Sequence, residues 1–306
     1  MSVVLFWSDP DVEGSYEEWR QRPLRFSEFH KLTFASHRKY STDPILYTYQ
    51  FVEEAPRGIE VRDANKYLPA KLAWGALRRG HSIAHISDAV RLYAAADCEG
   101  IVMDMDAVVI KPLPDDEVFF CSMPAKATGG MAPKWGKSHP PLTVHDGSWD
   151  GKALSAFPCK VNGFCYIPMY KLAEHIITML TQSVEKTSKG WNFVMWELKR
   201  ILASNKSYKA FPPIATCPLP AWLGAGKCYS LESPTRLDGT NELFGYPLPS
   251  IEDIEQNTFV IQHFFESAFQ DAPLKTSAFW HNVPDGSLVA KEAEWILGEN
   301  WRNKLL

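Results

Sequence analysis

Residues 100–109 read GIVMDMDAVV, an apolar run interrupted by two aspartates, Asp104 and Asp106, with one residue between them. The apolar residues 101–103 predict a short buried strand, and Gly100 just before them is a candidate C-cap of the preceding helix. On a strand that continues through the motif, side chains two positions apart point to the same side. We therefore expect a pair of carboxylates at the end of a buried strand.

The chain before this motif alternates the patterns of strands and helices. Such alternation is typical of an α/β fold, with a mainly parallel sheet and helices on its faces. Ligands of these sheets bind beyond the carboxyl ends of the strands, so we expect residues 7–9 to lie near Asp104. Apolar runs predict strands at residues 3–7, 45–49 and 58–61, and helical spacing predicts helices within residues 15–40 and at 82–97.

The chain after this motif is less regular. Residues 116–160 are rich in Gly, Pro, Lys and Ser and predict a long loop region. No clean linker separates the two parts, so we expect a single domain over residues 1–306, with halves at 1–115 and 116–306. Helical patterns cover residues 168–182, 191–203 and 289–304, the last as a terminal amphipathic helix.

Composition excludes several classes of protein. Hydrophobic residues make up 45% of the 306 residues and charged residues 22%, which is ordinary for a globular protein and excludes disorder and collagen-like repeats. The net charge of −4 gives no global field for nucleic acid, so we expect no nucleic-acid partner. No apolar run is long enough for a transmembrane segment, and the start lacks the pattern of a secretory signal. These features predict a cytoplasmic protein.

The two aspartates predict a metal site. Neighbouring carboxylates repel each other when both are ionised, and a divalent cation relieves that cost. Hard cations such as Mg²⁺ or Mn²⁺ prefer carboxylate and phosphate oxygens, and they keep positions open for phosphates of a substrate. Asp104 and Asp106 therefore indicate a site for a metal and a diphosphate, although a D-x-D pair by itself is a weak signal.

A second polar group precedes the motif. Ser87 is a candidate N-cap of a helix, and Asp88 and Arg91 are three apart, on one helical face. Taken alone, this pair is most simply an exposed ion pair. The alternative is that Asp88 accepts hydrogen bonds from sugar hydroxyls while Arg91 meets a phosphate or hydroxyl.

Together these segments resemble the DXD-containing glycosyltransferases with a GT-A fold, and most of all glycosyltransferase family 32. That family includes bacterial polysaccharide transferases, yeast mannosyltransferases of the initiating α-1,6 type and, more distantly, clostridial glucosylating toxins. The resemblance rests on Ser87-Asp88-x-x-Arg91, the helix and strand after it, Asp104-x-Asp106, LFWSD (5–9), FASHRKYSTDPILYTY (34–49) and IEVRDANKYLP (59–69). It covers residues 1–115 and thins out after them, where VNGFCYIP (161–168) and VIQHFFES (260–267) are the similar segments and residues 125–155 have no counterpart.

The resemblance implies a GT-A-type, Rossmann-like mixed sheet flanked by helices, with a nucleotide-sugar half at 1–115 and an acceptor half at 116–306. Asp104, Asp106 and Arg91 would be catalytic. Asp106, Asp104 and His263 would hold Mn²⁺ or Mg²⁺, although Phe265 and Glu266 depart from the Trp and Asn that often follow the histidine. The donor would be bound by Phe6, Trp7 (stacked on the base), Ser8, Asp88, Arg91, Asp104 and Asn162.

The reaction implied is transfer of a hexosyl or N-acetylhexosaminyl group, with retention, from a nucleotide sugar. A UDP-sugar is favoured over a GDP-sugar, and the acceptor would be a glycan or a lipid-linked oligosaccharide. Polysaccharide biosynthesis in the cytoplasm, or at the inner face of the membrane, is the setting that the resemblance implies.

Two other functions compete with this one. A phosphatase of the haloacid-dehalogenase type also has a D-x-D motif after an apolar strand, with Asp104 as nucleophile and Asp106 as general acid. The upstream Asp88 and Arg91 have no role in that reading. A non-catalytic glycan-binding protein would instead use loop tryptophans for stacking on sugars: Trp135, Trp149, Trp191, Trp222 and Trp280.

Overall fold

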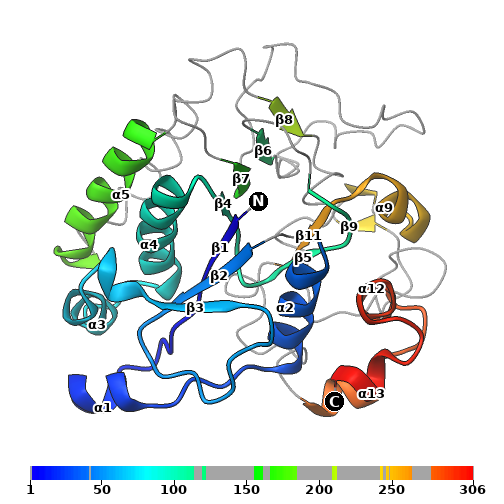
Figure 1. Cartoon of the computed structure of the whole chain (residues 1–306), viewed down its shortest axis with the longest axis horizontal. Coiled ribbons are helices and arrows are strands. Elements are labelled where there is room, and N and C mark those ends of the chain that lie inside the picture. Colours follow the sequence, from blue (N-terminus) through cyan, green and yellow to red (C-terminus); the bar gives the residue numbers. More distant parts are fainter. Residues whose placement is uncertain are drawn as a thin grey trace.

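A mixed sheet lies at the centre of the molecule, with helices on both of its faces (Figure 1). The computed structural model describes residues 2–40, 43–113, 119–121, 155–160, 166–184, 209–211, 242–243, 246–247, 249–263 and 277–305. The strand order is β3-β2-β1-β4-β7-β6-β8. These strands are β1 (Ser2–Phe6), β2 (Asp43–Thr48), β3 (Glu60–Asp63), β4 (Ile101–Val102), β6 (Phe119–Cys121), β7 (Ser155–Lys160) and β8 (Lys209–Phe211).

The N-terminal part of the sheet is parallel, as the alternation of strands and helices predicts. Strands β3, β2, β1 and β4 run parallel, whereas β7 pairs antiparallel with both β4 and β6. The α/β class with a mixed sheet flanked by helices is therefore confirmed. Strands β6 and β7 both lie within residues 116–160, so the prediction that this whole segment is a loop is wrong at these strands, and the rest of the segment lies outside the described residues.

Strand β1 is buried on both faces, which explains its unbroken apolar sequence. Val4 and Phe6 pack in a core with the helices α3 (Ala70–Arg78), α4 (Ile83–Cys98) and α5 (Tyr166–Leu180). Val3 and Leu5 point to the other face, where Phe34 of α2 (Glu28–Tyr40) covers them. This alternation fixes the register of the central strand.

The N-cap of helix α4 lies five residues before the cap that the motif suggests. Ser82 is its N-cap, and the Ser82 side chain accepts a hydrogen bond from the backbone N–H of Ala84. Ser87 therefore lies inside the helix, and its predicted role as a cap is wrong. The reason is that the apolar pattern of the helix already begins at Ile83.

The end of α4 is also shifted by one residue. Glu99, with φ of 53°, takes the left-handed C-cap conformation. Gly100 is required for a different reason: a Cβ on it would lie 2.9 Å from Sγ of Cys98 and 3.1 Å from Cγ2 of Val4. The glycine thus allows β4 to lie close beside β1.

The chain turns at the two aspartates and does not continue as one strand. Strand β4 ends at Val102, and the backbone N–H of Ala107 donates to the carbonyl of Asp104 at 3.2 Å. Strand β5 (Ala107–Val109) then pairs antiparallel with β11 (Val260–Gln262) in a separate sheet. The expectation that Asp104 and Asp106 share a face of one strand is therefore wrong, and a tight turn holds them together instead.

The C-terminal helical pattern is divided in two. Helix α12 (Leu288–Leu297) ends at Gly298, whose φ of 85° stops the helix, and α13 (Trp301–Leu305) follows. The predicted helix at 168–182 corresponds to α5, while 191–203 lies outside the described residues.

Within the described part of the chain, no helix has the length and apolarity needed to cross a membrane. The remaining elements are α1 (Tyr16–Gln21), η1 (Ala64–Lys66), β9 (Glu242–Leu243), β10 (Tyr246–Pro247), α9 (Ile251–Asn257) and α11 (Ser277–Asn282).

Candidate functional site

The carboxyl ends of β1 and β4 lie side by side, as the sequence predicts. Val4 is paired with Val102, and the backbone N–H of Met103 donates to the carbonyl of Val4 at 3.1 Å. The parallel register therefore carries Asp104 to the level of the end of β1, where Trp7 follows the strand. This edge is the place where ligands bind in such sheets.

Arg91 joins the two polar groups that the sequence singles out. Its side chain is 2% exposed and forms ion pairs with Asp88, at 3.0 Å, and with Asp104. Its Nε also donates to the carbonyl of Ser87 at 3.4 Å. The side chains of Asp88 and Asp104 remain 23% and 28% exposed. A buried cation thus holds two carboxylates that still reach solvent, and the simple exposed ion pair is not what the structure shows.

The carboxyl of Asp88 is electrostatically unusual. Burial raises its pKa to about 7, with Asp104 adding to the rise and Arg91 opposing it. A carboxyl group in this state can accept a hydrogen bond when ionised and donate one when protonated. Strongly perturbed groups of this kind gather at functional sites, although structural ion pairs perturb pKa values too.

Asp106 occupies the turn after Asp104 and is half-buried. Its carbonyl accepts a hydrogen bond from the backbone N–H of His263 at 2.9 Å, because β5 and β11 pair next to it. The backbone of His263 is therefore beside the acidic motif, as the predicted metal site requires. These two segments are more than 150 residues apart in the sequence.

The ring of His263 is engaged elsewhere. Its Nε2 lies 2.9 Å and 3.1 Å from the carboxylate oxygens of Glu292 in α12. Both side chains are buried, and the ring of His263 packs edge-on against that of Phe29, with the ring centroids 5.1 Å apart. Among the described residues, no three His, Cys, Asp or Glu side chains gather in a way that could hold a metal ion. The role of His263 as a metal ligand stays a prediction.

The three residues at the end of β1 have different surroundings. Phe6 is 3% exposed and packs edge-on against Tyr49 in the core. Ser8 is fully buried, and its hydroxyl donates to the side-chain oxygen of Gln50. Trp7 is half-buried, with its ring 4.7 Å from that of His30. The side chains of Phe6 and Ser8 thus belong to the interior, and their predicted contact with the nucleotide-sugar donor stays untested. Trp7 is the residue of the three whose ring is still partly exposed.

His30 and Glu292 have no place in the sequence-based site. His30 is fixed by Ser27, whose hydroxyl lies 3.1 Å from Nδ1, and this S-x-x-H spacing was the available signal. No sequence spacing pointed to Glu292, because it is 29 residues from its partner His263.

Of the predicted residues, Asn162 lies outside the described residues. The same holds for Trp135, Trp149, Trp191 and Trp222, whereas Trp280 is fully buried in the core and cannot stack on a glycan.

Comparison with known proteins adds one weak likeness. No family model matches the chain. No curated protein matches its sequence. Among solved structures, the chain is similar to the PaToxG glycosyltransferase, with a TM-score of 0.34 and 11% identity over 67% of this chain and 77% of that one. A likeness at this level does not assign the chain to a family or define its site.

Proposed function

We propose that this chain is a metal-dependent glycosyltransferase, which moves a sugar from a nucleoside-diphosphate sugar to a hydroxyl of a glycan or lipid-linked acceptor. The observation that carries the proposal is the arrangement around Arg91. One buried guanidinium holds Asp88 and Asp104 at the edge where two parallel strands end, beside the turn that contains Asp106. The resemblance of residues 1–115 to family 32 supports the same function.

The carboxylates fit a hard divalent cation. Asp104 and Asp106 sit on one tight turn, and both side chains keep some exposed surface. Two carboxylates are enough for Mg²⁺ or Mn²⁺, since such ions complete their coordination with water and with substrate phosphates. The metal would neutralise the negative charge that develops on the leaving diphosphate.

The protein's own residues then position the donor. Arg91 fixes the position of the Asp104 carboxylate through their ion pair. Asp88, on the preceding helix, offers an oxygen to a hydroxyl of the sugar or ribose, and Trp7 offers a ring face to the base. Preference for a uridine donor, retention at the anomeric carbon and a hexosyl or N-acetylhexosaminyl group are parts of the proposal that rest on the resemblance alone.

The two competing functions gain no specific support. A phosphatase of the haloacid-dehalogenase type needs Asp104 as a nucleophile, but its carboxylate is paired with Arg91. Glycan binding through loop tryptophans cannot use Trp280, because this side chain is fully buried in the core. We therefore retain the transferase as the working function.

The test is a donor panel with Mn²⁺ and the full chain. UDP-glucose, UDP-galactose, UDP-N-acetylglucosamine and GDP-mannose are each incubated with the protein, and nucleotide release and thermal stabilisation are recorded. We expect one donor to stabilise the protein in the presence of metal and to release its nucleotide slowly in water. Asp106→Asn should lose both effects. Asp43→Asn is the matched control, because Asp43 is exposed at the opposite, amino end of β2. The panel is repeated with Mg²⁺, and if no nucleotide sugar binds with either metal, the proposal is wrong.

A further inference from the structure

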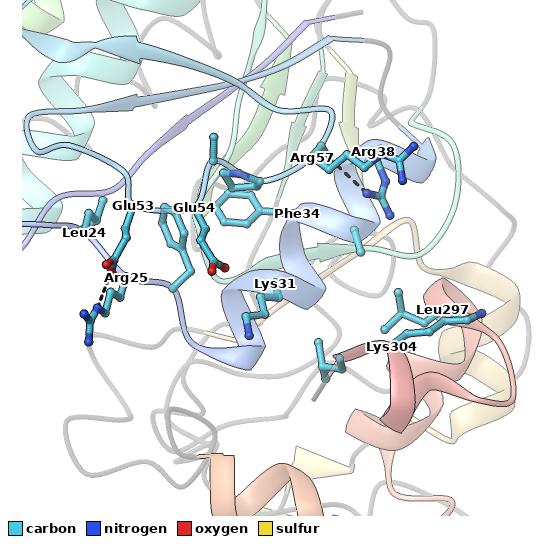
Figure 2. A pocket seen from close by; sticks show the side chains of 15 residues that line it. Leu24, Arg25, Lys31, Phe34, Arg38, Glu53, Glu54, Arg57, Leu297 and Lys304 are labelled. Atoms are coloured by element: carbon cyan, nitrogen blue, oxygen red, sulfur yellow. Dashed lines mark hydrogen bonds and ion pairs between the residues drawn. The ribbon is translucent and has the colours of Figure 1, made fainter.

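A cavity of about 640 Å³ lies along α2, and none of the residues that line it has a role in the proposed transferase site. Four segments form it: residues 24–26, one face of α2, the loop at residues 53–57, and Leu297, Lys304 and Leu305 from α12 and α13 (Figure 2). On α2 the lining residues are Lys31, Phe34, Ala35 and Arg38. Their spacing of three, four and seven places them on one stripe of the helix. The volume is in the usual range for small-molecule sites.

The rim of the cavity carries a surplus of positive charge. Lys31, Arg38, Arg57 and Lys304 all line it and are exposed. None of the four forms an ion pair within the described part of the chain. Arg38 donates to the carbonyl of Arg57 at 3.4 Å, and Lys304 donates to the carbonyl of Leu297. These backbone contacts orient the two side chains but leave their charge uncompensated.

The acidic residues of the rim do not balance these cations. Glu53 is paired with Arg25 at 2.7 Å, at the far left of Figure 2. Glu54 is the other carboxylate in the lining, so about three positive charges remain without a counter-charge. Like charges around a hollow with apolar walls focus the electric field into it and raise the local concentration of anions.

The floor of the cavity is apolar. Leu24, Phe34 and Leu305 are buried there, each with less than a tenth of its surface exposed. Phe26 and Phe34 pack edge-to-face with their ring centroids 4.8 Å apart and form one wall. The apolar surface that is still open to solvent belongs to half-buried side chains such as Phe26 and Ala35, and it favours hydrocarbon over a small hydrated ion by about 25 cal/mol for each Å² removed from water.

From this division between rim and floor, we propose that the cavity binds an amphiphile that bears a phosphate on an alkyl chain. The phosphate is held by Lys31, Arg38 and Arg57, and the chain lies against Phe26 and Ala35. A phosphate monoester carries a charge of about −1.5 to −2 at neutral pH, which matches the surplus better than a single carboxylate does. Arginine also binds phosphate through two parallel hydrogen bonds.

The experiment is calorimetric titration of the full chain with dodecyl phosphate, below the concentration at which it forms micelles. Inorganic phosphate and dodecyl maltoside are titrated in parallel. Inorganic phosphate carries the charge without the alkyl chain, and dodecyl maltoside carries the alkyl chain without the charge. We expect saturable binding of dodecyl phosphate to one site, at least about tenfold tighter than either comparison, and weakened by added salt. Equally tight binding of inorganic phosphate, equally tight binding of dodecyl maltoside, or no binding would each overturn the proposal.

Variants assign the binding to this cavity. Lys31→Glu combined with Arg57→Glu reverses two exposed charges that form no ion pair, and should weaken binding by about tenfold or more. Ala35→Phe should fill part of the cavity and weaken binding without a change of charge. Lys71→Glu, on the exposed side of α3 and outside the lining, is the matched control and should leave binding unchanged. An equal loss in the control would overturn the assignment to this site.

A vesicle arm separates a single amphiphile from a membrane surface. The protein is floated with vesicles of phosphatidylcholine, alone or with phosphatidic acid. Binding to phosphatidic acid vesicles together with dodecyl phosphate monomers supports the proposal, because both present the same phosphate and chain. Binding to the vesicles but not to the monomers would overturn it in favour of a general electrostatic membrane surface. None of these measurements depends on transferase activity, so the cavity and the proposed function can fail separately.

Discussion

Arg91 and Asp104 form an ion pair in which the cation is 2% exposed and the carboxylate is 28% exposed. Arg91 also binds Asp88, so two acidic groups depend on a single buried charge. This makes the centre of the site a structural element as well as a chemical one. Loss of fold and loss of function must therefore be measured separately at these residues.

Arg91→Met should destabilise the protein. It would leave Asp88 and Asp104 close together without their shared counter-charge. Removal of one partner of a fully buried pair costs about 3–5 kcal/mol, and the partial exposure of both carboxylates reduces our expectation to about 2–4 kcal/mol. Urea unfolding followed by circular dichroism measures the loss. Arg62→Met, which breaks an exposed pair with Glu60, is the control and should cost less than about 1 kcal/mol. An Arg91→Met protein as stable as the wild type would contradict the pairing.

Asp104→Asn and Asp106→Asn should have different consequences. Asp104→Asn weakens both the ion pair with Arg91 and the metal site, so stability and metal-dependent donor binding should fall together. Asp106→Asn should lower the midpoint of thermal unfolding less than Asp104→Asn does, while abolishing metal-dependent donor binding. Thermal unfolding with and without Mn²⁺ and donor distinguishes the two. Unchanged nucleotide release by Asp106→Asn would refute its role as a metal ligand.

Trp7→Ala tests the proposed contact with the base. Stacking of a base on an aromatic ring contributes about 1–3 kcal/mol, so nucleotide affinity should fall by about fivefold or more. The ring also packs against His30, and some stability should be lost as well. Trp7→Phe keeps a ring and should recover most of the affinity. If Trp7→Ala lowers only the midpoint of thermal unfolding, the residue is part of the core and the stacking proposal fails.

The parts of the fold that follow from local pattern could be predicted from the sequence. Strand β1 and helix α4 were predictable because a run of apolar residues or a helical period identifies them without knowledge of their neighbours. The neighbouring ends of β1 and β4 followed from the rule for parallel sheets. The link from Asp88 through Arg91 to Asp104 did not follow, because helical spacing alone cannot distinguish a buried arginine from an exposed one.

The parts that depend on distant residues could not be predicted. The turn at Asp104–Asp106 exists because β5 leaves the main sheet and pairs with β11, which is contributed by residues 260–262. The carboxylate that meets the ring of His263 comes from α12, and no sequence spacing signals that contact. The N-cap of α4 is Ser82 and not the predicted Ser87, because the buried Ile83 belongs to the helix and extends it upstream of the motif.

Glu292→Ala should cost more stability than any surface substitution on the same helix. Both Glu292 and His263 are buried, so removal of the carboxylate leaves a ring nitrogen without its partner and opens a cavity. We expect a loss of about 3–5 kcal/mol. Glu292→Gln keeps a hydrogen-bond acceptor and should cost about 1–2 kcal/mol. The control is Glu294→Ala, which removes an exposed pair with Lys291 and should cost less than about 1 kcal/mol. Equal losses in Glu292→Ala and Glu294→Ala would contradict the buried pair.

His37 should make stability fall as the solution becomes acidic. Its side chain is fully buried in α2, and this burial lowers its pKa to about 3, from an ordinary value of 6.5, with the backbone of Ala107 partly opposing the shift. Between these two pH values the unfolded chain binds a proton at His37 that the folded chain does not. The contribution of His37 to the free energy of unfolding is therefore complete above pH 6.5. It is lost progressively as the pH falls toward 3, and the free energy of unfolding changes by up to about 1.4 kcal/mol per pH unit. His37→Gln should flatten the pH dependence of the unfolding free energy between pH 6.5 and 5, whereas His281→Gln, at an exposed position in α11, should leave it unchanged. Parallel curves for His37→Gln and the wild type would show that His37 takes up its proton without unfolding.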